Sequence, residues 1–188
     1  MQHRTFIAIN LPEKIKNRLV GFQVKHSSLP ARWTKKENLH ITLLFIGSVK
    51  TEEIPDISES VKQTVQKHNA CLINLNKICY GPPKKMPPRM VWAVGDKSEE
   101  IGRLYKELKS SLFTSNLENF KPDNRAYYPH ITLARIRKWE FKRIEPEERP
   151  EIEEDISLTF EVNSIEIMES QLKKRGPEYT ILESIPLQ

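Results

Sequence analysis

The sequence feature that most constrains the fold is the string His-Ile-Thr-Leu, which occurs at residues 40–43 and again at residues 130–133. In both places the string closes the same order of predicted elements: a strand, an amphipathic helix, a loop and a second strand. A pattern that repeats over such a length indicates an internal duplication. We therefore expect two similar halves in a chain of 188 residues, a length that fits one domain with two lobes.

The first half begins with an alternating strand at residues 6–11, which stops at Pro12, where a helix starts. Apolar residues at helical spacing between residues 15 and 22 predict that helix. Residues 38–47 are rich in β-branched and aromatic side chains and predict the strand that carries the first string. Gly47 is expected to end this strand.

The second half repeats this order. Residues 90–94 predict a strand closed by Gly95, and apolar residues at helical spacing between 101 and 112 predict a helix. A polar loop at residues 116–124 follows. The half ends with a strand at residues 128–135, which carries the second string.

The remaining segments complete an α+β architecture. The pattern predicts a helix at residues 54–65, a strand at 72–80 and two late strands at 156–168 and 179–187, joined by a turn at 174–177. Few of these elements form strict strand-helix-strand units, and the hairpins indicate antiparallel pairing. Both observations favour α+β over a doubly wound parallel sheet.

The formal charge of +5 indicates a mild preference for polyanionic partners. Basic residues are concentrated directly after the second string, between residues 135 and 143, and in a proline-rich loop at residues 84–89. The acidic run at residues 145–155 is expected to be a solvated loop. Charge alone does not identify a function.

Several classes of protein are excluded by composition. No apolar run approaches the roughly 20 residues that a membrane-spanning helix needs, and residues 6–9 are too short for the core of a signal peptide. We therefore expect a cytoplasmic protein. Cys71 and Cys79 have odd numbers within one predicted strand, so they should share a face as two reduced thiols.

The repeated string carries chemistry because side chains alternate along a strand. His40 and Thr42 point to one face, as do His130 and Thr132, while the isoleucine between each pair points to the core. If the halves pair about a pseudo-two-fold axis, two imidazoles and two hydroxyls converge. One neutral imidazole can accept a proton from a nucleophile and one imidazolium can donate to a leaving oxygen. The hydroxyls can stabilise phosphoryl oxygens, so the constellation suits cleavage of a phosphodiester.

Metal-site and covalent-nucleophile chemistry fit these residues less well. A zinc site would need more ligands than two histidines with neighbouring threonines, and the chain has no nucleophile elbow and no suitably placed cysteine. His3, His26 and His68 have no threonine two residues later and no counterpart in the repeat. They are expected to be surface or helix-end residues.

The two strings resemble the paired His-x-Thr motifs of the two-histidine phosphoesterase superfamily, and in particular of the RNA 2′,3′-cyclic phosphodiesterases, also called 2′-5′ RNA ligases. This resemblance implies a bilobal α+β fold in which two antiparallel sheets flank a central cleft, with all residues, 1–188, in a single domain. It covers nearly the whole chain and includes residues 6–12, 32–33, 37–40, 89–93, 129–130, 134–135, 169–170, 172, 176–177 and 179.

The resemblance also implies roles for the residues of both strings. His40 would be the general acid that protonates the leaving O3′, and His130 the general base that activates water, so that a 2′-phosphate end forms. Thr42 and Thr132 would hold the phosphate, and no metal or cofactor is expected. Because the halves are nearly symmetric, the sequence alone does not assign the acid and the base.

Arg135 resembles a phosphate-binding arginine of this family, and Phe45 occupies the equivalent position after the first string. Arg135 follows His130 by five residues, so strict alternation places the two side chains on opposite faces. Arg135 reaches the shared face only if the strand bulges or ends there. Otherwise it belongs to the solvated basic cluster.

Three further functions remain open from the sequence. The same site could join RNA halves through a 2′-5′ linkage, since hydrolysis and ligation are related by microscopic reversibility. The fold could be a non-catalytic module that binds RNA or nucleotides, with Trp33, Tyr127 and Tyr128 as stacking platforms. A small cyclic phosphate such as ADP-ribose 1″,2″-cyclic phosphate could replace RNA as the substrate. We expect a monomer.

Overall fold

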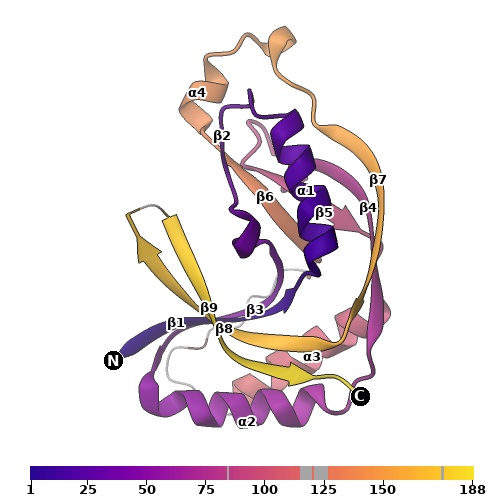
Figure 1. The fold of residues 1–188 in the computed structure, drawn as a ribbon. Coiled ribbons are helices and arrows are strands. Elements are labelled where there is room, and N and C mark those ends of the chain that lie inside the picture. Colours follow the sequence, from indigo (N-terminus) through magenta and orange to yellow (C-terminus); the bar gives the residue numbers. More distant parts are fainter. Residues whose placement is uncertain (84, 115–119, 121–126, 175) are drawn as a thin grey trace.

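The computed structural model describes residues 1–83, 85–114, 120, 127–174 and 176–188 and has the α+β fold that the sequence predicts (Figure 1). Apart from Phe120, the polar loop predicted at residues 116–124 lies outside the described residues, as do Lys84 and Arg175. In the described part of the chain, no helix combines the length and the apolar composition needed to cross a membrane.

The described strands form one continuous antiparallel sheet in the order β7-β4-β5-β6-β3-β1-β8-β9, with β2 paired to β6. The sheet consists of two halves, and between β3 and β6 the pairing is limited to Ile41 with Ile131. One half contains β1 (Gln2–Asn10), β3 (His40–Lys50), β8 (Ser164–Lys173) and β9 (Gly176–Pro186). The other contains β2 (Ala31–Trp33), β4 (Cys71–Gly81), β5 (Met90–Gly95), β6 (His130–Ile136) and β7 (Glu153–Val162).

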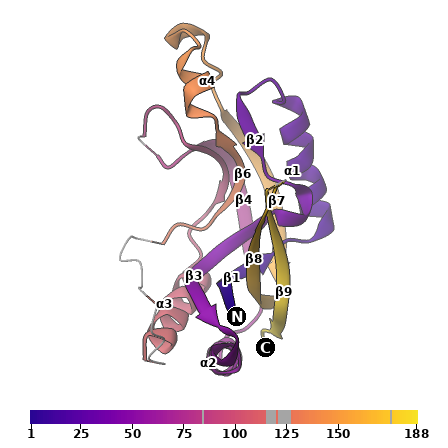
Figure 2. The same cartoon turned by 90° about the vertical axis from the view of Figure 1, so that its left-hand side faces the viewer.

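Helix α1 (Glu13–Lys25) connects the two halves, because it follows β1 of one half and packs on the other half. Its residue Gln23 donates a side-chain hydrogen bond of 3.2 Å to the carbonyl of Leu133 in β6. Helices α2 and α3 pack on each other below the half that contains β1 and β3, and β3 and β6 run between these helices and α4 (Figures 1 and 2). The helices are α1 (Glu13–Lys25), α2 (Ile54–Val65), α3 (Glu99–Thr114) and α4 (Lys138–Lys142), with short 3₁₀ turns at Lys36–Asn38, Thr51–Glu53 and Pro146–Glu148.

The strand pairing repeats in register between the halves, including one irregularity. In β1 and β3, Ala8 faces Thr42 and Ile7 faces Leu44, so Leu43 is an extra residue in β3. In β5 and β6, Trp92 faces Thr132 and Val91 faces Ala134, so Leu133 is the corresponding extra residue. Each string therefore ends in a β-bulge, which reverses the alternation of the residues that follow.

The prediction that Gly47 ends the first motif strand is wrong. Strand β3 continues to Lys50, and Gly47 adopts a φ of 103° within it. Phe6 faces Phe45 whereas Thr5 faces Gly47, so a second bulge lies here. A positive φ is a conformation that glycine adopts without steric cost, and an isolated glycine in a strand often marks a bulge.

Residues 156–168, predicted as one strand, belong to two strands. The chain leaves β7 after Val162 and enters β8 at Ser164, so that β7 pairs with β4 and β8 with β1. Apolar residues occupy even positions up to Val162 and the odd positions 165 and 167 beyond it, so the alternation changes phase where the chain changes partner. The hairpin of β8 and β9 follows and projects to one side (Figure 1).

Two smaller predictions also need correction. The end of the acidic run is strand, since β7 begins at Glu153, whose carboxylate lies 2.7 Å from the Nζ of Lys77. The register of β4 shifts between Leu75 and Lys77, so Cys71 and Cys79 do not share a face although both are free thiols. Burial shows that the alternation of side chains changes phase at this shift, because the buried residues are Ile73 and Leu75 before it and Ile78 after it.

Candidate active site

The four side chains of the repeated string lie on one face of the sheet, where its halves meet. Ile41 and Ile131 are paired antiparallel and fully buried on the opposite face. Their flanking residues, the two histidines and the two threonines, are all half-buried. Because the strands are antiparallel, His40 lies on the same side of this pair as Thr132, and Thr42 on the same side as His130. The two motifs are thus brought together as the sequence predicts.

His40 is held by contacts at both ring nitrogens. Its Nδ1 lies 2.8 Å from the backbone carbonyl oxygen of Asn38, so in the neutral ring this nitrogen carries the proton and donates it. Its Nε2 lies 3.0 Å from Thr42 Oγ1, whose hydroxyl then donates to the ring. The rings of Phe6 and Tyr179 lie with centroids 5.1 and 5.2 Å from the imidazole. These contacts leave Nε2 as the nitrogen of His40 that can exchange a proton.

His130 has the same backbone contact but different neighbours. Its Nδ1 lies 2.7 Å from the carbonyl oxygen of Tyr128, again two residues earlier in the chain. The ring of Trp92 stacks on the imidazole with centroids 3.9 Å apart and an angle of 29° between the planes. Both motif histidines therefore use Nδ1 as a backbone donor and keep Nε2 for chemistry, as in many proton-transfer sites.

Burial lowers the pKa of both histidines. The pKa of His40 falls to about 4, because desolvation of the imidazolium and the charge of His130 outweigh the hydrogen bond to the Asn38 carbonyl. Burial also lowers the pKa of His130, against the effect of the Tyr128 carbonyl. In the free protein at neutral pH both imidazoles are therefore uncharged. An anion placed between them would favour the uptake of a proton.

This burial predicts that the protein loses stability in acid through His40. Its folded-state pKa lies below its unfolded value, so the stabilisation is present above pH 6.5 and is lost as the pH falls toward 4. The shift corresponds to about 3 kcal/mol. Urea unfolding of the wild type and of His40→Gln between pH 7.5 and 4 should show about this difference in pH dependence. Equal pH dependence in both proteins would contradict a buried, neutral His40.

The bulge at Leu133 brings Arg135 to the face that carries His130. Leu133 and Ala134 are both buried, so the alternation changes phase and Arg135 is exposed. Phe45 follows the bulge of β3 in the same way and is 68% exposed. The geometric condition for Arg135 to reach the shared face is thus met.

The rings around the two histidines could not be assigned from the sequence. Phe6, Trp92 and Tyr179 come from β1, β5 and β9, and alternation along a motif strand does not say which residue of another strand lies against it. Cross-strand register supplies that information. Their occurrence in segments that resemble the family was the available signal.

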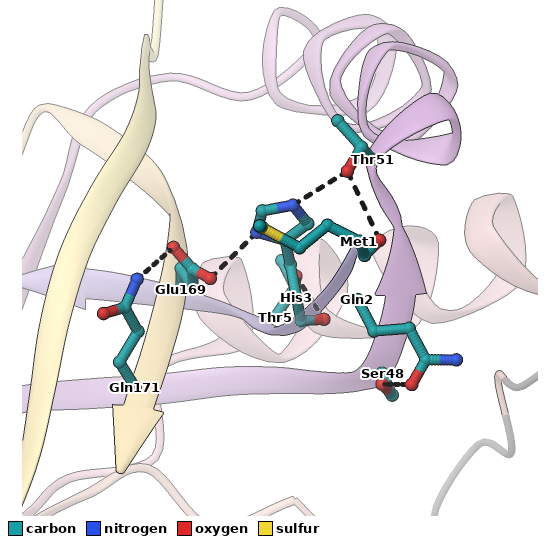
Figure 3. Close-up of polar contacts among 8 residues, drawn as sticks. All are labelled: Met1, Gln2, His3, Thr5, Ser48, Thr51, Glu169 and Gln171. Atoms are coloured by element: carbon teal, nitrogen blue, oxygen red, sulfur yellow. Dashed lines mark hydrogen bonds and ion pairs between the residues drawn. The ribbon is translucent and has the colours of Figure 1, made fainter. Parts of the chain in front are cut away.

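The other histidines lie outside this face. His3 is half-buried in β1, so the prediction of a surface or helix-end position is wrong for it. Its Nδ1 lies 2.8 Å from Glu169 Oε1 and its Nε2 3.0 Å from Thr51 Oγ1, which links β1 to β8 and to the turn before α2 (Figure 3). His68 follows the end of α2, is 6% exposed and lies 3.0 Å from Glu107. His26 follows α1 and packs on Phe22.

Comparison with known proteins agrees with this geometry. A family model described as LigT like Phosphoesterase matches residues 9–92 and 94–179, each stretch containing one His-x-Thr string. RNA 2′,3′-cyclic phosphodiesterases of Thermotoga maritima and Methanocaldococcus jannaschii are each 30% identical to the chain. The alignment with the Thermotoga protein covers 95% of this chain and 92% of that protein. The alignment with the Methanocaldococcus protein covers 96% of this chain and 98% of that protein. A crystal structure of a Thermus thermophilus protein superposes with a TM-score of 0.84 at 28% identity, covering 98% of this chain and 97% of that one.

Proposed function

The chain belongs to the family of LigT-like phosphoesterases, and we propose that it hydrolyses the 2′,3′-cyclic phosphate at the end of an RNA to a 2′-phosphate without a metal ion. The observation that carries this proposal is the pair of imidazoles on one face, each with Nδ1 bound to a backbone carbonyl and Nε2 left for proton transfer. The relatives from Thermotoga and Methanocaldococcus carry the name of this activity.

In the proposed reaction, His130 Nε2 takes a proton from water while the water oxygen attacks phosphorus. The P–O3′ bond breaks, and His40 Nε2 gives its proton to O3′. The products are a 3′-hydroxyl, which carries the proton from His40, and a 2′-phosphate, while His130 keeps the proton taken from water. Exchange with solvent restores the starting charges. Relief of strain in the five-membered ring and the general acid and base together lower the barrier.

Substrate binding has to favour the protonated, positively charged form of His40. The pKa of His40 is about 4 in the free protein, so few molecules carry the imidazolium at neutral pH. A bound cyclic phosphate carries a negative charge, which favours the protonated ring. Once Nε2 carries a proton, the hydroxyl of Thr42 no longer donates to it and is released to bind a phosphoryl oxygen. Thr132 would bind a phosphoryl oxygen from the other strand.

Arg135 would complete the phosphate site with a charge-assisted contact, since guanidinium groups bind phosphate oxygens in a planar fork. Arg135→Ala is expected to lower kcat/KM for a cyclic phosphate by about 100- to 1,000-fold, the range for loss of one group that stabilises charge in the transition state. Arg137→Ala is the matched control, because Arg137 lies exposed just beyond β6 and pairs with Glu140. Steady-state kinetics should separate the two, and equal losses would place Arg135 in the general basic surface.

The proposal is tested with a short RNA that ends in a 2′,3′-cyclic phosphate, incubated with the protein in excess EDTA and followed by phosphorus NMR. We expect complete conversion to the 2′-phosphate. A 3′-phosphate would contradict the proposed direction of attack, and loss of turnover in EDTA would contradict metal independence. Tight binding without turnover would support the non-catalytic module instead. Added RNA with a 5′-hydroxyl end would reveal any 2′-5′ ligation.

We also propose that residues 1–188 act as a single bilobal domain with one active site between the halves. Two contacts between the halves support this proposal. Helix α1 follows β1 of one half but bonds through Gln23 to β6 of the other, and β3 pairs with β6 at the junction. Separate expression of residues 1–82 and 83–188 should then give no folded, active half.

A further inference from the structure

The two identical strings have different neighbours at one equivalent position. Trp92 of β5 faces Thr132, whereas the residue that faces Thr42 in β1 is Ala8. The Trp92 side chain is 7% exposed and stacks on His130 at 3.9 Å. A methyl group at residue 8 offers no such surface to His40.

Trp92 is itself fixed on the side away from His130. Strand β5 lies between β4 and β6, and Gly81 of β4 is the diagonal neighbour of Trp92, because Gly81 pairs with Met90 and Cys79 with Trp92. A β-carbon at Gly81 would overlap Cδ2, Cε3 and Cε2 of the indole. The ring therefore fills the space that glycine leaves and is held between Gly81 and the imidazole.

We propose that Trp92 is a positioning residue that acts through His130, that Gly81 makes its placement possible, and that this support differentiates the two identical motifs. The inference rests on the proposed function. The carbonyl of Tyr128 fixes Nδ1 but leaves the imidazole free to turn about that contact, and the stacked indole fixes the plane of the ring. Together the two contacts determine where Nε2 points. A shift of about 1 Å in a reacting group is enough to lower a rate by about 100-fold.

A second observation separates this role from packing. The Nε1 of Trp92 is buried without a hydrogen-bond partner among the described residues. Burial of an unpaired N–H group costs free energy, which a phenyl ring would avoid. The indole is therefore not the side chain that stability alone would favour beside His130.

Four variants test the proposal by kinetics on the cyclic phosphate. Trp92→Ala should lower kcat/KM by about 100-fold, and Trp92→Phe, which retains a ring, should recover most of that loss. Gly81→Ala keeps the indole but displaces it, and should lose at least about 10-fold. Gly21→Ala is the matched control, since a β-carbon at Gly21 in α1 meets nothing within 4 Å. Equal losses for Trp92→Ala and Trp92→Phe would overturn the proposal.

The decisive readout needs no substrate. Burial lowers the pKa of His130, so removal of the indole should admit water and raise that pKa toward its ordinary value. NMR titration of the imidazole C–H signals in wild type, Trp92→Ala and Trp92→Phe measures this directly. An unchanged His130 titration in Trp92→Ala would show that the indole does not control the surroundings of that ring, which would overturn the proposal. If the wild type shows no turnover, the proposed function fails while the titration still tests the placement of His130.

Discussion

Replacement of either His40 or His130 by alanine is expected to lower kcat/KM for a cyclic phosphate by about 10³- to 10⁴-fold. Each imidazole supplies one proton transfer, and a positioned general acid or base contributes up to about 10⁴-fold. The two losses should not multiply in the double variant, because the proton transfers belong to a single displacement at phosphorus. Steady-state kinetics with a synthetic cyclic phosphate measures all three values.

His3→Ala is the matched control for these variants. His3 is a half-buried histidine that also contacts a threonine hydroxyl, but it lies between β8 and the turn before α2 (Figure 3). Its loss is expected to leave kcat/KM within about two-fold of the wild type, as for a residue remote from the chemistry. If His40→Ala or His130→Ala retained more than a tenth of the wild-type activity, the two-histidine mechanism would be wrong.

The second large effect is a steep decline of kcat/KM in mild alkali. The reaction needs one histidine protonated and the other neutral, and the two titrate as a coupled pair. Burial lowers both pKa values below 6.5, to about 4 for His40. Above both values the singly protonated population falls tenfold per pH unit. We therefore predict a decline of about 100-fold between pH 6.5 and 8.5.

This profile is measured at substrate concentrations far below KM, where kcat/KM reports the free enzyme. The direction follows from the sign of the shifts, since lowered pKa values move the whole profile toward acid. Activity that stayed constant from pH 6.5 to 8.5 would contradict this mechanism, because neither buried histidine could then supply the proton for the leaving oxygen. A solvent-exposed pair would keep its maximum nearer to pH 6.5.

The helices and strands were largely predictable because each follows from a local pattern of apolar and polar residues. The helices at residues 54–65 and 99–114 follow from apolar residues at helical spacing, and α1 follows from the same spacing after Pro12. The two motif strands follow from β-branched density, and alternation gives the buried isoleucines at 41 and 131. The repeat then placed both motifs in equivalent positions.

What the sequence could not supply is the pairing between strands. The bulges at Leu43 and Leu133 decide which face Arg135 occupies, and a bulge has no signature in the alternation of a single strand. The change of partner at Asn163 coincides with a change of phase in the apolar alternation, but that pattern does not say which strand each segment pairs with. Both corrections depend on contacts between residues far apart in the chain.

In the candidate site, too, the motif residues were predictable but the side chains around them were not. Identical strings predicted two histidines and two threonines, and the structure places all four on one face. The strings could not distinguish His40 from His130, since the difference lies in Phe6 and Tyr179 around one ring and Trp92 against the other. Assignment of acid and base thus depends on surroundings that the repeat does not share.

The central claim is that His40 protonates the O3′ leaving group while His130 activates water. It is tested most directly with a substrate in which sulfur replaces O3′ in the cyclic phosphate, since a thiolate (pKa of about 8.5 for a cysteine thiol) leaves without a proton. We predict that His40→Ala hydrolyses this substrate at close to the wild-type rate, whereas His130→Ala remains inactive. Rescue of His130→Ala in place of His40→Ala, or rescue of neither, would contradict the claim.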